Sequence, residues 1–232
     1  MTNQKPYIKI TRDGPYMVFG LSKIAEKIIL TDGNGISVKY GNGDVFQVKT
    51  DPVAVCRCGR SLHAPFCDGS HIEGGFDGTC TAPKTPILKN AELIQGDKID
   101  LADNERYCAF ARFCDAGGRI WNLVMAGGEV ADDMAVREAT LCPAGRLLMF
   151  TKDGHSLDEK YDPELNTIED SGLKISGPLW VKGGIVVEDE NGATYEIRQK
   201  QTLCRCGRSG NKPFCNGAHA SSRFLAHKSP TK

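Results

Sequence analysis

The chain alternates between short runs of apolar and polar residues, separated by turns that contain glycine, asparagine or aspartate. The runs VFQVKTDPVAVCRC (45–58) and ATYEIRQKQTLCRC (193–206) place apolar side chains at about every second position. A period of two predicts β-strands with one buried face. DGNG (32–35) and DENG (189–192) are predicted turns between strands, so we expect antiparallel hairpins.

A helical pattern occurs in the middle of the chain, at DDMAVREATL (132–141), where acidic residues lie near the predicted helix start. TAPKTP (81–86) and the polar segment 152–172 are predicted connections on either side of it. The pattern therefore predicts an α+β, β-rich protein in three parts. We expect these parts to span 1–80, 84–155 and 168–232.

The two outer parts repeat each other. DGPYMVFG (13–20) resembles SGPLWVKGG (176–184), and CRCGRSLHAPFCDGSH (56–71) resembles CRCGRSGNKPFCNGAH (204–219). Both cysteine-rich stretches follow the pattern C-x-C-x8-C-x3-H. Its positions are filled by Cys56, Cys58, Cys67 and His71, and again by Cys204, Cys206, Cys215 and His219. Because one copy offers too few strands for independent stability, we expect the copies to pack together about a pseudo-twofold axis.

The amino-acid composition argues against several classes of function. The 29 basic residues balance the 29 acidic ones, which argues against a sequence-independent nucleic-acid binder. No apolar run is long enough for a transmembrane helix, and the first residues lack the apolar core of a signal peptide. We therefore expect a cytoplasmic protein without a membrane partner. In that compartment disulfides are rare, so the 10 cysteines favour metal binding or reactive thiols.

The spacing of the repeated motif favours an iron–sulfur cluster over zinc. Structural zinc usually takes cysteine pairs spaced C-x2-4-C, whereas a C-x-C pair places two sulfurs close together on an extended strand. The first two cysteines can bind one iron of a 2Fe–2S cluster, and the third cysteine and the histidine the other. Zinc binding and merely reactive thiols remain the alternatives.

The motif resembles the CDGSH-type iron–sulfur domain, the mitoNEET-like family. The residues that match the family pattern beyond the ligands are Ser61, Pro65, Asp68 and Gly69 in the first copy and Ser209, Pro213 and Gly217 in the second. The second copy departs at Asn216, where the family has aspartate. The resemblance implies one 2Fe–2S cluster per motif, held by three cysteines and one histidine. It also implies that two motifs pair through a β cap, here as an internal pseudo-dimer whose further oligomeric state is open.

Other residues of the motif receive less specific predictions. His63 has no histidine counterpart in the second copy, so we do not expect it to be a ligand. Asp68 and Asn216 are expected to cap the turn that follows them. Arg57 and Arg205 either temper the cluster charge or are simply solvated.

Three further cysteines lie between the repeats, in YCAFARFCDAGG (107–118) and TLCPAGRLL (140–148). Cys108, Cys114 and Cys142, the last followed by proline, resemble a divergent single-cluster ferredoxin domain. In that frame the middle ligand position is Ala111, which cannot bind iron. The resemblance implies a small inserted α+β domain with a 3Fe–4S or 4Fe–4S cluster. Zinc and a degenerate site retained as core are the alternatives.

Cys80 lies outside all three motifs. It is either a fourth ligand of the central cluster or a small buried apolar residue, and the second is the simpler interpretation. Phe113 and Trp121 are expected to be core residues.

Neither a dinucleotide fingerprint nor a P-loop is present, and no Ser–His–Asp arrangement can be argued from the sequence. We therefore expect an electron carrier rather than an enzyme, which moves single electrons between partner proteins through 2Fe–2S centres. Transfer of clusters or iron to apo-acceptor proteins, or redox sensing, is the second hypothesis. A zinc-binding interaction module is the third.

Overall fold

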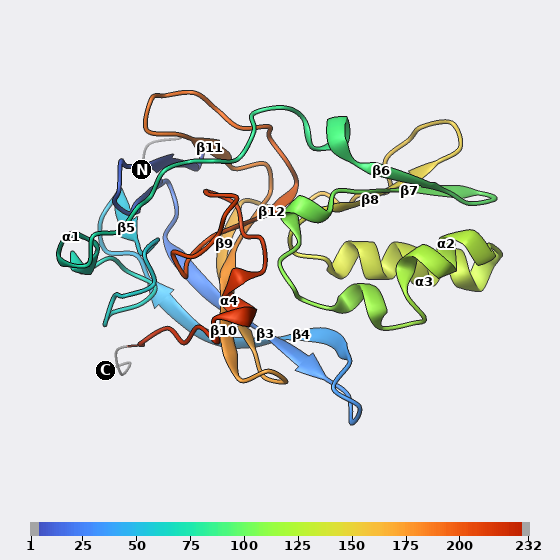
Figure 1. Ribbon diagram of the computed structural model, residues 1–232, viewed down its shortest axis with the longest axis horizontal. Helices are drawn as coiled ribbons and strands as arrows, with labels where there is room; N and C mark the ends of the chain where they lie inside the picture. The colour runs from blue at the N-terminus through green and yellow to red at the C-terminus, as the bar shows by residue number, and fades with distance from the viewer. Residues whose placement is uncertain (1–4, 229–232) are drawn as a thin grey trace.

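The computed structural model describes residues 5–228 of the 232-residue chain. The fold is α+β and rich in β-structure, as predicted, with few helices and several sheets. Figure 1 shows helices α2 (Ile120–Ala126) and α3 (Glu129–Leu141) at one end of the molecule and the strands of the two repeats at the other. In the part of the chain that the structure describes, no helix has the length and apolar character needed to cross a membrane.

The N-terminal repeat forms five strands. They are β1 (Tyr7–Ile10), β2 (Tyr16–Phe19), β3 (Lys23–Thr31), β4 (Ser37–Gln47) and β5 (Val53–Val55). The predicted turn at 32–35 joins β3 to β4. The Asp32 carboxylate closes it by accepting hydrogen bonds from the backbone N–H groups of Asn34 and Ile36, both at 2.9 Å. This Asx-type turn explains why the hairpin forms here.

The C-terminal repeat forms β9 (Glu164–Asp170), β10 (Ile175–Lys182), β11 (Val186–Glu188) and β12 (Lys200–Leu203). Strand β9 lies inside the segment 152–172, which the sequence pattern predicts to be only a connection; that prediction is wrong for residues 164–170. The alternating run 193–206 is a regular strand only at β12. Side chains earlier in that run contact the middle of the chain instead: Glu196 accepts a hydrogen bond from the Ile87 N–H at 2.8 Å.

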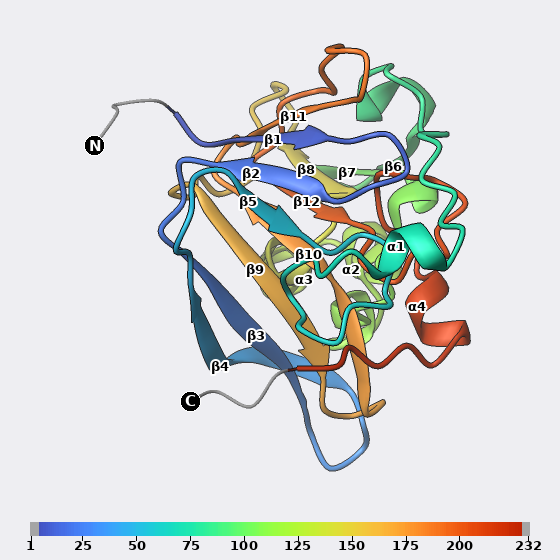
Figure 2. The same cartoon turned by 90° about the vertical axis from the view of Figure 1, so that its left-hand side faces the viewer.

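The two repeats exchange strands. One sheet has the order β11-β1-β2-β5 and the other β12-β10-β9-β3-β4. Strand β11 of the C-terminal repeat runs parallel to β1, and β3 of the N-terminal repeat runs parallel to β9. Figure 2 shows both pairs side by side. Each repeat thus completes the sheet of the other.

A single apolar core joins the two sheets. Its fully buried side chains come from both repeats and include Ile8, Ile10, Tyr16 and Val55 together with Leu165, Leu179, Val187 and Leu203. Burial of this apolar surface is the main stabilising contribution to such a pair of sheets. Because the core is shared, neither repeat can keep its buried face covered alone.

The middle of the chain builds a smaller unit. Strands β6 (Glu92–Gln95), β7 (Ile99–Asp103) and β8 (Leu147–Thr151) form an antiparallel sheet in that order, packed against α2 (Ile120–Ala126) and α3 (Glu129–Leu141). The predicted helix at 132–141 is therefore confirmed as the larger part of α3, whereas α2 was not predicted. The domain boundaries 1–80, 84–155 and 168–232 stay a prediction.

The shared core generates a stability prediction. Leu179 is fully buried between the sheets, so Leu179→Ala should lower the free energy of unfolding by about 2–5 kcal/mol, because it leaves a cavity. Urea denaturation followed by tryptophan fluorescence measures the change. Ile197→Ala is the matched control, since Ile197 is 61% exposed and its truncation should change stability by no more than about 0.5 kcal/mol. Equal effects of the two variants would contradict a core at Leu179.

Candidate metal centres

Each cysteine-rich loop folds back along the strand that precedes it. At the end of β5 the Cys56 N–H donates to the Pro65 carbonyl at 2.8 Å, and the Cys67 N–H donates to the Ala54 carbonyl at 2.9 Å. At the end of β12 the same bonds join Cys204 to Pro213 and Cys215 to Thr202, at 2.8 and 2.9 Å. The loop therefore brings the third cysteine beside the C-x-C pair although eight residues separate them in sequence.

The eight predicted ligands form four close pairs. The Sγ atoms of Cys56 and Cys58 lie 3.7 Å apart, and the Cys67 Sγ lies 3.4 Å from the His71 Nδ1. The corresponding distances in the second copy are identical, 3.7 Å for Cys204–Cys206 and 3.4 Å for Cys215–His219. Among residues 5–228, no group of three or more His, Cys, Asp or Glu side chains is arranged to hold a single metal ion.

A short turn brings each histidine back to its cysteine. Gly69 and Gly217 have φ of +91° and +84°, a region that favours glycine, and they precede the one-turn helices α1 (Ser70–Glu73) and α4 (Ala218–Ser221). The Asp68 Oδ1 accepts a hydrogen bond from the Ser70 N–H at 3.1 Å, and the Asn216 Oδ1 accepts one from the Ala218 N–H at 3.2 Å. The predicted capping role of both residues is confirmed.

The serines of the motif have a structural role. The Ser61 hydroxyl donates to the Phe66 carbonyl at 2.7 Å and accepts from the His63 N–H at 3.0 Å. The Ser209 hydroxyl repeats this with Phe214 and Asn211 at the same distances. Each hydroxyl therefore closes the loop between the second and third cysteines. His63 enters this arrangement through its backbone N–H.

Arg57 and Arg205 are buried, with 2% and 3% of their surface exposed, so the alternative that they are solvated is wrong. Their Nε atoms donate to the carbonyls of Gly14 and Gly177, both at 2.9 Å. Both acceptors belong to the repeated Gly-Pro segments, 13–20 and 176–184. Each arginine therefore links its C-x-C loop by a hydrogen bond to the first hairpin of its own repeat. The guanidinium groups also lie over aromatic rings, Phe76 for Arg57 and Phe224 for Arg205, at 5.2 and 5.8 Å.

The two C-x-C loops touch each other through their backbones. A Cβ atom added to Gly59 would lie 2.7 Å from the Cys206 carbonyl oxygen, and one added to Gly207 would lie 2.5 Å from the Cys58 carbonyl oxygen. Both glycines have positive φ, at +77° and +75°. Tyr16 strengthens the connection, because its buried hydroxyl donates to the carbonyl of Cys204 at 2.9 Å. The structure thus brings the N-terminal and C-terminal sites together.

The two sites differ in burial. Cys215 and His219 are 2% and 5% exposed, whereas Cys67 and His71 are only half-buried. Burial lowers the pKa of His219 to about 4, and the neighbouring Arg205 acts in the same direction. Burial also raises the pKa of the Cys215 thiol. Within the C-x-C pairs, the contact with Cys58 lowers the pKa of Cys56, and the contact with Cys206 lowers that of Cys204. Each pair therefore has one thiol disposed to ionise.

Cys108, Cys114 and Cys142 line one cavity in the middle unit. Cys108 follows the 3-10 helix η2 (Glu105–Tyr107), Cys114 lies in η3 (Phe113–Asp115), and Cys142 ends α3. The structure therefore brings together three cysteines that the ferredoxin-like spacing selects. Ala111 lies in the same lining, so the wall of the cavity contains the alanine where that frame expects a ligand.

Cys80 is not among the residues that line this cavity. Its sulfur lies 3.9 Å from Nη1 of Arg57, and its side chain packs against the core shared by the repeats. The geometry therefore gives no support to Cys80 as a fourth ligand and agrees with the simpler interpretation as a packed residue.

Arg146 is a candidate site residue that the sequence motifs do not single out. It lines the cysteine cavity, is 5% exposed and pairs with Asp103 at 3.3 Å. Burial acts to lower the pKa of Arg146, but Cys108 and Asp103 raise it more strongly, so the guanidinium stays charged beside the sulfurs. Its place four residues after Cys142, in CPAGR, is the sequence signal that could have found it.

Phe113 and Trp121 behave as predicted core residues. Phe113 is 1% exposed and packs beside Tyr40, with ring centroids 4.7 Å apart. Trp121 packs against the apolar core of the middle unit, and its indole N–H donates to Asp103 at 3.0 Å.

The central cavity adjoins the C-terminal site. A Cβ atom added to Gly217 would lie 3.2 Å from the Cys108 carbonyl oxygen. Cys215 packs in the same apolar cluster as Cys142. The three sulfur-rich sites are therefore contiguous, in the order N-terminal, C-terminal, central.

Comparison with known proteins identifies both repeats. A family model described as the iron-binding zinc finger CDGSH type matches residues 13–72 and 176–220. These two regions contain all eight residues of the close ligand pairs. No curated protein and no solved structure matches the chain. The chain therefore contains two regions of the CDGSH iron-binding type, one in each repeat.

Proposed function

We propose that this protein is an iron–sulfur electron carrier with one 2Fe–2S cluster at each CDGSH motif. The observation that carries the proposal is the continuity of the three sulfur-rich sites, because electrons pass efficiently only between neighbouring centres. When bound, a 2Fe–2S cluster accepts and returns single electrons at a potential set by its ligands and surroundings. The contacts of Gly59 with Cys206 and of Gly217 with Cys108 hold the three sites side by side.

The donor atoms fit a cluster with two irons. Cys56 and Cys58 would bind one iron, while Cys67 and His71 would bind the other; the C-terminal copy would use Cys204 and Cys206, then Cys215 and His219. A zinc ion draws four donors around one centre. The pairing of the donors at 3.7 and 3.4 Å supports two irons per site instead. This argues against the zinc-binding interaction module.

The paired sites also support an internal pseudo-dimer. In the N-terminal repeat, Lys9 of β1 lies opposite β2 and pairs on its other side with Glu188 of the C-terminal repeat. In the C-terminal repeat, Asn166 of β9 holds the corresponding place: it lies opposite β10 and pairs on its other side with Ala25 of the N-terminal repeat. We propose that the exchanged strands form a pseudo-twofold β cap with the cluster-binding loops below it. The buried arginines would hold those loops and offset part of the negative charge of the clusters.

The central cysteines are proposed to hold a 3Fe–4S or a 4Fe–4S cluster in a ferredoxin-like domain. Three thiols line the cavity, and Arg146 supplies a positive charge beside them. A cluster with three protein thiolates and a nearby cation fits this donor set. Without Cys80 in the lining, a fourth iron would need a ligand other than a cysteine of this cavity.

The proposed role is transport and not catalysis, and the proposed partners are redox proteins. The second candidate function is delivery of a cluster or iron to an apo-acceptor protein. It is favoured by one observation: Cys67 and His71 are half-buried, so an acceptor could reach the N-terminal ligands more easily than the C-terminal ones. The cytoplasmic location expected from the sequence stays a prediction.

Metal content should separate the three sites. The purified chain should contain about four irons in its two 2Fe–2S clusters and about three to four more in the centre. Cys114→Ala should remove only the central irons, because the CDGSH ligands do not include it. The matched control Cys80→Ala should keep every iron. Iron and acid-labile sulfide assays on anaerobically prepared protein measure this, and colourless protein with stoichiometric zinc would refute the cluster assignment.

Replacement of the histidine ligands should change one site at a time. His71→Cys should lower the reduction potential of the N-terminal cluster only, and His219→Cys that of the C-terminal cluster only, because a charged thiolate replaces a neutral imidazole. His63→Cys is the matched control, since His63 belongs to the same loop but to no ligand pair. Redox titration followed by electron paramagnetic resonance measures the potentials. Unchanged potentials in His71→Cys and His219→Cys would remove the histidines from the ligand set.

The electron-transfer and cluster-transfer hypotheses predict different locations for the iron after the reaction. The reduced holoprotein should pass electrons to oxidised cytochrome c and keep its irons. When the oxidised holoprotein is incubated with an apo-ferredoxin and separated from it, iron should stay on this chain. Movement of iron to the apo-ferredoxin, at a rate faster than spontaneous loss, would instead favour the delivery function.

A further inference from the structure

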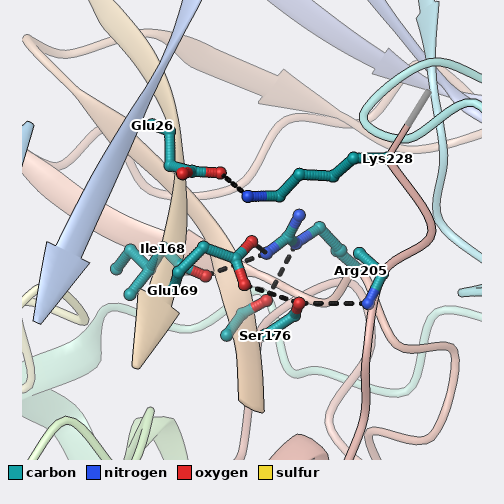
Figure 3. Close-up of polar contacts among 8 residues, drawn as sticks. Glu26, Ile168, Glu169, Ser176, Arg205 and Lys228 are labelled. Atoms are coloured by element: carbon teal, nitrogen blue, oxygen red, sulfur yellow. Dashed lines mark hydrogen bonds and ion pairs between the residues drawn. The ribbon is translucent and has the colours of Figure 1, made fainter. Parts of the chain in front are cut away.

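The buried arginines of the two CDGSH sites have different charge partners. Arg205 forms an ion pair with Glu169, whose Oε1 lies 2.7 Å from Nη2. The other oxygen of Glu169 accepts a hydrogen bond from the Ser176 hydroxyl at 2.6 Å. Figure 3 shows Glu169 between Ser176 and Arg205, and its carboxylate faces the guanidinium. The positive charge at the C-terminal site is therefore neutralised by a fixed carboxylate.

Arg57 makes the same backbone contacts without that carboxylate. Its guanidinium donates to the carbonyls of Gly14 and Thr11, at 2.9 and 3.1 Å, and Nη1 faces the Cys80 sulfur at 3.9 Å. Burial raises the pKa of Cys80, although Arg57 opposes the shift, so this neighbour is a neutral thiol. Within residues 5–228, no carboxylate lies within ion-pair distance of Arg57. Asp77 is near it but fully exposed, and solvent screens its charge.

The charges of Arg205 and Glu169 act on the C-terminal site. Arg205 lies in the chain between the proposed ligands Cys204 and Cys206, so the charge of its guanidinium and the charge of the paired Glu169 both act on this site. Arg112 and Asp170 form an ion pair with each other at 2.7 Å and so contribute little net charge. Glu169 is thus the residue that removes the positive field of Arg205 from this site.

Burial acts in the same direction as the charges. Reduction adds a negative charge to a cluster, and a buried site disfavours the more charged state more strongly than a solvated one. Cys215 and His219 are almost fully buried, whereas Cys67 and His71 are half-buried. Both differences make the C-terminal cluster the harder one to reduce.

One difference between the copies acts in the opposite direction. The N-terminal motif has Asp68 where the C-terminal motif has the neutral Asn216. The Asp68 side chain is exposed to water, which screens its charge, while Glu169 is only 16% exposed. Glu169, the less exposed carboxylate, therefore has the larger effect on its site.

From these contacts we infer that Glu169 lowers the reduction potential of the C-terminal cluster below that of the N-terminal cluster. The inference rests on the proposed function, since it requires both clusters. Its consequence is an order of reduction. The first electron taken up by the two clusters resides at the N-terminal site, whose ligands are the more exposed. The two copies of one motif then differ in role, with the buried site as donor and the exposed site as acceptor.

Stepwise reduction of the wild-type holoprotein tests the order. Dithionite added in fractions of an electron equivalent should first produce the electron paramagnetic resonance signal of the N-terminal cluster. His71→Cys and His219→Cys identify which signal belongs to which site. Appearance of the C-terminal signal first, or of both signals together at every step, would overturn the inference. Absence of any 2Fe–2S signal or acid-labile sulfide would instead refute the proposed function.

Glu169→Gln tests the cause. Glutamine can keep the hydrogen bonds to Ser176 and Arg205 without the charge, so the midpoint of the C-terminal cluster should rise toward that of the N-terminal one. Glu164→Gln is the matched control: Glu164 lies on the same strand β9, but its side chain is 49% exposed and pairs with Lys182, so both midpoints should stay in place. An unchanged C-terminal midpoint in Glu169→Gln, with its cluster retained, would overturn the role of Glu169. If that variant fails to load its cluster, the wild-type order still decides whether the two potentials differ.

Discussion

The close contact between the backbones of the two C-x-C loops is the constraint on which the rest of the structure depends. Gly59 and Gly207 each lie against a carbonyl of the opposite loop, at distances that leave no room for a Cβ atom. The loops can meet only because β11 and β3 cross into the sheet of the other repeat and because one apolar core covers both sheets. The buried arginines then fix each loop to its own hairpin. The repeats are therefore folded as one body, and each candidate metal centre is held in place by both halves of the chain.

Within this shared arrangement the two copies have diverged where charge and solvent matter most. The backbone bonds, the serine hydroxyls and the donor pairs agree to within the quoted distances, because they determine whether the loop closes. The surroundings differ: Glu169 neutralises Arg205, whereas Arg57 faces a neutral sulfur. Two sites with the same ligands can thus have different electrostatic fields. This is a simple physical route from a duplicated motif to a pair of centres with distinct roles.

The middle unit adds a third sulfur-rich site without disturbing the first two. It has its own sheet and its own apolar core, but that core also includes Cys215 of the C-terminal motif. Its cysteine cavity adjoins the more buried CDGSH site and not the more exposed one. The middle unit thus extends the row of three sulfur-rich sites at the end where the more buried CDGSH site lies. If the proposed clusters are present, the half-buried N-terminal ligands are at the opposite end of that row, where a partner protein has easier access.

The sequence by itself determined the local chemistry: the two C-x-C-x8-C-x3-H motifs, the family, the capping roles of Asp68 and Asn216, and the helix at 132–141. Each of these depends on residues close together in the chain, so spacing and side-chain type are enough. Only the tertiary structure decided what surrounds them. Strand β9 escaped prediction because the polar residues around it resemble a loop until β3 and β10 pair with it on either side. The burial of Arg57 and Arg205, the pairing of Arg205 with Glu169 and the separation of Cys80 from the central cysteines all depend on contacts between distant segments. Such contacts have no periodic signature in the sequence, because they arise only when the exchanged strands bring the segments together.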